Sequence, residues 1–310
     1  MSREKELVVL ALGGNALIRR GQKGAFKDQL ANLKRIAPDI ARLARKYTLL
    51  ITHGNGPQVG ALSLQQEVAR DQVPPQPLHV CVAMTQAQIG YMIQLAISDA
   101  DPSLTVAVVL TRVLVDLHDP AFEKPSKPIG PYYDREEAEL LEKEMGWVFA
   151  RIPGRGYRRV VPSPRPLEVI DIRAIESALE ACDVVVAGGG GGIPVTLKGK
   201  GLVGVDAVID KDLTSSLLAR TLRATKFVIL TDVDAVYINY GTPNAQPLRR
   251  VTPSVLRKYL KEGHFPPGSM GPKVEAVIEF VEATGKAAAI GHLDEMHAVV
   301  EGEKGTLIRP

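Results

Sequence analysis

Two lysines lie among carboxylates and helix-opening residues, where their charges could act on an anionic group. Lys211 stands between Asp210 and Asp212 at the expected start of a helix, and Lys273 follows a Gly-Pro pair at the start of another. A cation at a helix N-terminus is unfavourable unless an anion lies nearby. The aspartates alone are also typical of a helix N-cap, and Lys273 alone could be a solvated side chain. The functional hypothesis is that Asp212 holds Lys211 and directs it at a phosphoryl group.

Three glycine-rich breaks each follow an apolar run that predicts a buried strand. They are Gly13-Gly14-Asn15 after 7–12, His53-Gly54-Asn55-Gly56 after 47–52, and Gly188 to Gly192 after 183–187. Such loops expose backbone N–H groups, and the next helix points its positive end at the same place. A single break could be a plain tight turn. Three of them indicate a site for several anionic groups, as phosphoryl transfer requires.

A fourth motif, Thr231 to Tyr237, closes another predicted strand with Asp232 and Asp234. Acidic residues at a strand end bind ribose or define a turn, so a nucleotide role is one of two interpretations. The GxxxxGK[ST] loop and the GxGxxG fingerprint are both absent, as are the loops of protein kinases. The glycine loops therefore belong to another phosphate-binding design.

The elements that must position these residues alternate along the chain. Strands are predicted at 7–12, 47–52, 104–110, 183–187, 226–231 and 287–290, and helices at 27–46, 57–70, 79–99, 171–181, 212–223, 252–261, 271–284 and 294–300. This alternation predicts an α/β fold with a mostly parallel sheet between helical layers. Ligands bind at the carboxyl ends of such strands, where the glycine loops lie. A proline-rich stretch at 112–166, with a helix at 134–145, breaks the rhythm, and we expect it to form a small lid.

Composition excludes several classes of protein. The 310 residues are 45% hydrophobic and 24% charged, and a net charge of only +3 argues against a general nucleic-acid surface. The uninterrupted apolar runs fall well short of the roughly 18–20 residues that span a membrane, so we expect no membrane association. Residues 1–6 show no signal-peptide pattern. Cys81 and Cys182 lie among apolar neighbours, and we expect both to be reduced in a cytoplasmic protein.

In this order the motifs resemble the amino-acid kinase superfamily, and within it the carbamate kinases. The segments that carry the resemblance are ALGGNAL (11–17), THGNGPQVG (52–60), KPIGPYY (127–133), AGGGGGIPV (187–195), VDAVIDKDLTSSLLA (205–219), TDVDAVY (231–237) and GSMGPKVEA (268–276). The resemblance implies a three-layer αβα sandwich with a mainly parallel central sheet, one domain over 1–310, and a homodimer. Roughly 1–200 would bind the acceptor and 201–310 would bind ATP, with 112–166 as a protruding lid.

The resemblance also implies the chemistry: reversible phosphoryl transfer between ATP and carbamate, giving ADP and carbamoyl phosphate, with Mg²⁺ held mainly by the nucleotide and by no protein ligand set. The catalytic groups would be Lys127, Lys211, Asp212 and Lys273. Acceptor contacts would come from Gly13, Gly14, Asn15, Gly54, Asn55, Gly189 and Gly190. Nucleotide contacts would come from Asp210, Lys211, Asp232, Tyr237, Met270 and Lys273.

Chemical reasoning agrees with that implication. The acceptor oxygen of carbamate is already ionised, so no general base is needed, which fits the lack of an obvious catalytic His or Asp dyad. Two rivals stay open: a relative acting on another acceptor, and a non-catalytic nucleotide-binding or storage protein on the same fold. Partners are expected to be small molecules, and the sequence leaves open whether the enzyme makes ATP in arginine breakdown or carbamoyl phosphate for biosynthesis.

Three further features have two interpretations each. His53 could bond substrate or support the loop. The arginines between 151 and 165 could steer anionic substrates or form a solvated, ion-paired face. The apolar stretch 83–97 suits either a subunit interface or a core helix.

Overall fold

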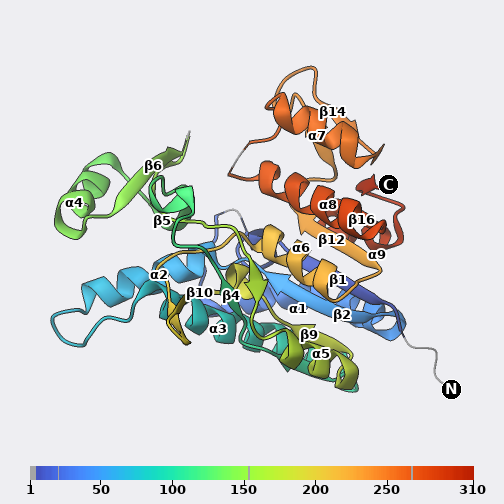
Figure 1. Cartoon of the computed structure of the whole chain (residues 1–310), viewed down its shortest axis with the longest axis horizontal. Coiled ribbons are helices and arrows are strands. Elements are labelled where there is room, and N and C mark those ends of the chain that lie inside the picture. The colour runs from blue at the N-terminus through green and yellow to red at the C-terminus, as the bar shows by residue number, and fades with distance from the viewer. Residues whose placement is uncertain (1–4, 20, 153, 267) are drawn as a thin grey trace.

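The computed structural model describes residues 5–19, 21–152, 154–266 and 268–310, and an eight-stranded sheet forms its centre (Figure 1). The prediction that residues 1–6 form no signal peptide falls mostly on residues 1–4, which lie outside the described ranges. In order across the sheet, the strands are β15 (Arg250–Val251), β17 (Thr306–Ile308), β16 (Ala287–His292), β12 (Lys226–Thr231), β1 (Leu7–Leu12), β2 (Thr48–His53), β9 (Val184–Val186) and β3 (Val106–Val108). Neighbouring strands run parallel except β16 and β17.

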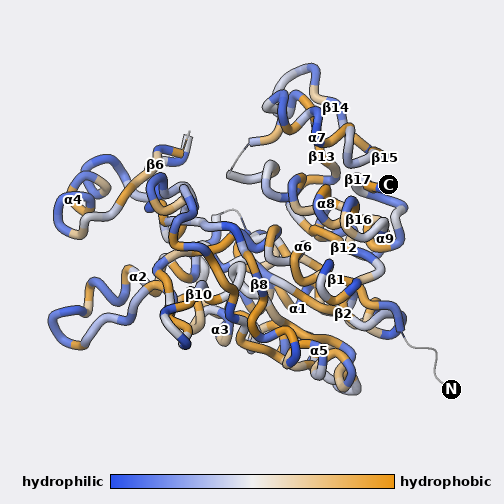
Figure 2. The backbone as a smooth tube through the Cα atoms, in the orientation of Figure 1, coloured by the Kyte–Doolittle hydropathy of each residue, from blue (hydrophilic) through white to orange (hydrophobic). Residues whose placement is uncertain are grey.

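Helices cover both faces of this sheet, as the alternation predicted. Side chains of β1 alternate between two cores: Val8, Leu10 and Leu12 face one, and Val9 and Ala11 face the other. The first core is closed by α1 (Phe26–Lys46), α3 (Leu78–Ala100) and α9 (Met296–Glu301). The second is closed by α5 (Ile172–Ala181), α6 (Lys211–Thr221), α7 (Pro253–Lys261) and α8 (Met270–Thr284). Burial on both faces explains why these strands are continuous apolar runs, seen as orange segments in Figure 2.

Helix α3 packs one side against the core, while the possibility that its exposed side forms a subunit interface stays a prediction. By length and composition alone it could cross a membrane, but 56% of its apolar window is buried inside the protein. Its buried residues include Cys81, Ile89 and Ile93. The polar side chain of Gln86 is also buried and donates to the carbonyl oxygens of Thr111 and Gly189. This is the pattern of a core helix, with Met84 and Tyr91 left exposed.

The sequence did not reveal the smaller sheets. Strands β11 (Gly201–Gly204), β10 (Ile193–Lys198), β4 (Arg112–Leu114) and β8 (Glu168–Val169) form a four-stranded sheet, and β13 (Val236–Ile238) pairs with β14 (Gln246–Leu248). Single helical turns occur at Gly14–Ala16, Pro120–Phe122, Gly189–Gly191 and Leu293–Glu295. The stretch 112–166 therefore contributes β4 to a sheet of the main body as well as forming the lid.

The protruding part of the lid is a second small unit. Strands β5 (Lys127–Tyr133), β7 (Gly156–Val161) and β6 (Val148–Ile152) form an antiparallel sheet, the lid sheet, with α4 (Arg135–Met145) beside it. Asp134 and Glu137 form a capping box at the start of α4, and Gly146 ends it in the left-handed conformation. In Figure 1 this unit projects from the body on the side opposite α8 and α9.

The lid sheet is seated on α2 (Gly56–Val68) through two glycines. A Cβ atom on Gly60 would lie 1.9 Å from the backbone nitrogen of Gly130 and 2.1 Å from its Cα. Gly130 itself has a positive φ of 74°. Only glycine at 60 permits this contact between helix and strand, so Gly60 fixes the position of β5 and of Lys127 at its start.

Candidate active site

The first two glycine breaks meet at the carboxyl ends of β1 and β2. The backbone N–H of Gly13 donates to the carbonyl of Leu230 at 2.9 Å, which ties the first break to β12. A Cβ on Gly54 would lie 3.9 Å from the nitrogen of Gly14 and 3.7 Å from Cδ of Lys211. The two acceptor loops predicted from the sequence therefore lie together, with the Lys211 side chain against them.

Asp212 holds two lysines. Its Oδ1 accepts a hydrogen bond from Lys211 Nζ at 2.5 Å, and its Oδ2 accepts one from Lys273 Nζ at 2.9 Å. The Asp212 side chain is 3% exposed, and those of Lys211 and Lys273 are 9% and 16% exposed. The first turns of α6 and α8 thus meet, with Lys273 bonded to a carboxylate 61 positions away in the chain.

Asp210 performs the N-cap role and also binds the lid. Its Oδ1 accepts from the backbone N–H of Asp212 at 2.8 Å and of Leu213 at 3.4 Å. Its Oδ2 accepts from Nζ of Lys127, the first residue of β5, at 2.5 Å. The cap and the lysine-holding carboxylate are therefore different residues: Asp210 caps the helix and Asp212 holds Lys211. That Lys211 is directed at a phosphoryl group stays a prediction.

Burial sets the electrostatics of this cluster. Burial would raise the pKa of Asp212, but Lys211 and Lys273 outweigh it and hold that pKa well below its usual range. Burial would likewise raise the pKa of Asp210, and Lys127 outweighs it. The pKa of Lys211 is lowered because burial outweighs its carboxylate partner. Three lysines face two aspartates, so the cluster has an excess of positive charge that an anionic substrate would neutralise.

The five-glycine break packs against His53 and Asn55 of the second glycine break. A Cβ on Gly189 would lie 2.3 Å from Nε2 of His53, and one on Gly190 would lie 2.2 Å from Nδ2 of Asn55. Asn55 is buried and its amide donates to Oγ1 of Thr85 at 2.9 Å. Gly189 and Gly190 are buried as well, so close packing is itself a reason for glycine at both positions.

His53 is a buried neutral side chain. It is 1% exposed, and burial lowers its pKa to about 4. Its Nδ1 lies 3.1 Å from the carbonyl oxygen of Gly54. This geometry supports the structural interpretation of His53, because the ring braces both the Gly54 turn and the glycine loop.

Four of the six predicted nucleotide residues line a cavity of about 260 Å³, whereas Asp210 and Lys211 are not part of its wall. Asp232, Tyr237, Met270 and Lys273 all contribute to its wall. The Tyr237 hydroxyl donates to Oδ1 of Asp234 at 2.7 Å, which orients the ring. Thr231, Val233, Ala235 and Ser269 also line the cavity and lie within the motifs quoted from the sequence, whereas sequence reasoning missed Tyr240, His264, Phe265 and Pro266. Their apolar surface suits a flat heterocycle next to a charged centre.

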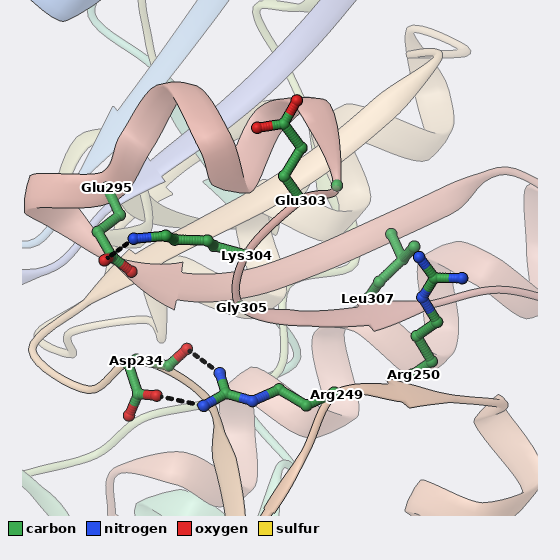
Figure 3. A pocket seen from close by; sticks show the side chains of 9 residues that line it. Asp234, Arg249, Arg250, Glu295, Glu303, Lys304, Gly305 and Leu307 are labelled. Carbon is green, nitrogen blue, oxygen red and sulfur yellow. Dashed lines mark hydrogen bonds and ion pairs between the residues drawn. The ribbon is translucent and has the colours of Figure 1, made fainter.

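A larger cavity, of about 400 Å³, lies away from the lysines (Figure 3). Its charged side chains are largely satisfied by one another. Arg249 donates to Asp234 Oδ2 at 2.7 Å, and Lys304 donates to Glu295 at 2.5 Å. Of the predicted site residues, the wall of this cavity contains none, so the smaller cavity with its lysine cluster is the candidate active site.

Comparison with known proteins agrees with this geometry. Residues 6–292 match the amino acid kinase family, and the chain therefore belongs to that family of phosphotransferases. It is 48% identical to the carbamate kinase of Thermococcus kodakarensis and 48% identical to that of Escherichia coli K12, in each case over 97% of this chain and 98% of the relative. The carbamate kinase of Giardia lamblia bound to AMP-PNP has a TM-score of 0.90 at 42% identity, covering 98% of each chain. Within the family, the chain belongs to the carbamate kinases, which confirms the resemblance and the fold class.

Proposed function

We propose that this protein transfers a phosphoryl group reversibly between ATP and carbamate, giving ADP and carbamoyl phosphate. The observation that carries the proposal is the lysine pair on Asp212, set between the glycine loops and the nucleotide cavity. Related chains of this identity are carbamate kinases, and the Giardia lamblia relative binds AMP-PNP.

The side chains divide the work by position. Phosphoryl transfer needs mainly alignment and neutralisation of the charge on the transferred group. Lys211 lies against the acceptor loops and Lys273 lines the nucleotide cavity, so the two ammonium groups flank the space where the phosphoryl group would pass. Asp212 fixes their separation, and Lys127 adds a third cation from the lid. No proton transfer is required, because the attacking oxygen of carbamate is already ionised.

The acceptor is proposed to bind at Gly13, Gly14, Asn15, Gly54 and Asn55 in the half spanning roughly 1–200. The nucleotide is proposed to bind in the half spanning 201–310. Asn55 and the buried Gly189 and Gly190 would contribute through the backbone they position, since the side chain of Asn55 is bonded to Thr85.

Magnesium would bind at this site together with the nucleotide. Over the described ranges, no group of three His, Cys, Asp or Glu side chains is placed to hold a metal ion. Asp210 and Asp212 are already bonded to lysines. The nucleotide phosphates would therefore hold Mg²⁺, and Asp232 is an exposed carboxylate in the cavity wall. Bound there, the ion would neutralise phosphate charge. A cytoplasmic homodimer remains our proposal from the resemblance.

Comparing several acyl phosphates as phosphoryl donors to ADP tests the proposal. ADP and Mg²⁺ are supplied with carbamoyl phosphate, acetyl phosphate or an aminoacyl phosphate, and ATP formation is followed. We expect carbamoyl phosphate to give the highest kcat/KM by a wide margin. A faster reaction with another acyl phosphate would assign the chain to a different acceptor.

A further inference from the structure

The structure separates the lid arginines into two groups with different surroundings. Arg165 is tied to the body, since it is bonded to Glu275 at 2.6 Å and to Glu279. Arg159 is half-buried over the ring of Trp147, 3.8 Å from its centroid, and donates to Ser63. In the part of the chain that the structure describes, no carboxylate forms an ion pair with Arg155 or Arg158.

These two unpaired arginines share one aromatic ring. The guanidinium carbons of Arg155 and Arg158 lie 5.8 and 5.3 Å from the centroid of Tyr132. Arg155 donates to the Tyr132 hydroxyl at 3.0 Å, and Arg158 donates to the carbonyl of Gly130 at 2.9 Å. The Nε of Arg158 is buried and has no hydrogen-bond partner. Two like charges are thus held together at the edge of the lid sheet, an arrangement that stabilises a bound anion.

Arg155 is an exposed residue at the tip of the lid sheet. It sits in the turn between β6 and β7, flanked by Gly154 and Gly156, both with positive φ. A Cβ on Gly156 would lie 2.6 Å from the carbonyl oxygen of Tyr133, so the turn is packed tightly onto β5. The side chain of Arg155 is near enough to Asp232, in the wall of the nucleotide cavity, for that carboxylate to help raise the Arg155 pKa, after the larger effect of Tyr132.

We propose that Arg155, held on Tyr132 beside Arg158, binds the phosphate chain of the nucleotide and so closes the lid over the substrate. The inference rests on the proposed nucleotide site and adds a binding residue to it. Arginine suits this role because its planar donors match phosphate oxygens. Lys127 at the start of β5 is already bonded to Asp210. The lid sheet would therefore contact the transferred phosphoryl group through Lys127 and the nucleotide through Arg155 in the β6–β7 turn.

The test compares ADP with adenosine by calorimetric titration of the whole chain. Arg155→Gln should weaken ADP binding about 10-fold or more, the loss typical of one charge-assisted bond to phosphate. Adenosine binding should not change, because adenosine has no phosphate. Tyr132→Phe removes only the hydroxyl that orients Arg155, and it should weaken ADP binding less. Arg151→Gln is the matched control, since Arg151 is an exposed arginine of the same hairpin.

Trp147 supplies a second readout, because it is the sole tryptophan and lies in the lid. ADP should change its emission in the parent chain and in Arg151→Gln, and change it less in Arg155→Gln. Unaltered ADP affinity in Arg155→Gln would overturn the proposal. So would an equal loss for adenosine, or an effect confined to the KM for carbamoyl phosphate. If the parent chain binds ADP but transfers no phosphoryl group, the proposed function fails while this binding test still decides the role of Arg155.

Discussion

Replacing Gly60 by alanine tests how the lid is positioned. In an ordinary helix interior this change stabilises by about 1 kcal/mol. Here the new methyl group would lie 1.9 Å from the nitrogen of Gly130 and 2.8 Å from the carbonyl carbon of Ile129. Both are backbone atoms of β5, so no side chain can rotate away. Restoring a contact of about 3.5 Å requires β5 to move by about 1.6 Å.

That displacement acts on Lys127 at the start of the same strand. Its Nζ is bonded to Asp210, and a shift of about 1 Å in a positioned group can cost about 100-fold in rate. We expect Gly60→Ala to lower kcat about 100-fold. Strain of about 1–3 kcal/mol should outweigh the helix-propensity gain and leave the chain slightly less stable.

The assay measures kcat for ATP formation together with urea unfolding. Gly201→Ala is the control, because the nearest atom to its new Cβ would be 3.9 Å away, and it should change neither quantity appreciably. A Gly60→Ala protein that keeps the parent rate and gains stability would refute the argument that this close contact fixes the lid.

Two other expectations concern buried charge. Asp212→Asn should lower the free energy of unfolding at pH 7 by about 3–5 kcal/mol, because Lys211 and Lys273 lose their shared carboxylate. Urea unfolding should show a smaller loss of stability at pH 9 than at pH 7. Equal losses at the two pH values would contradict this role of Asp212. His53 is neutral in the folded chain down to pH about 4 but takes up a proton below about 6.5 when unfolded. Stability should therefore be full above pH 7 and fall by up to about 3 kcal/mol as the pH drops from 6.5 to 4. His53→Gln should flatten that slope, whereas His118→Gln, at an exposed position, should leave it unchanged.

The fold could be predicted largely from the sequence because its central strands are buried on both faces. Continuous apolar runs such as Leu7–Leu12 and Lys226–Thr231 appear at the predicted positions. The lid sheet and the β13–β14 ribbon were missed, since their strands mix exposed and half-buried residues and lack a clear period. The alternating parallel order also gave no indication that β17 runs antiparallel at the far side of β16.

The site could be predicted in part. The sequence analysis predicted a cap at the start of α6 and Asp212 as the lysine-holder but left open which aspartate forms the cap, and the structure assigns the cap to Asp210. The sequence could not show that His53 leaves no room for a side chain at Gly189, because His53 comes from a distant strand. Phe265 and Tyr240 likewise reach the nucleotide cavity from loops that carry no recognisable motif.

We propose above all that the Lys211–Asp212–Lys273 cluster promotes phosphoryl transfer between carbamoyl phosphate and ADP. The most direct measurement is the rate of ATP formation from these substrates with Mg²⁺, in the parent chain and in Lys211→Ala, with ADP affinity measured in both. We predict rapid ATP formation by the parent, and a rate about 10²–10³-fold lower in the variant with ADP affinity largely retained. A variant as fast as the parent, or a parent that binds ADP and forms no ATP, would contradict the claim.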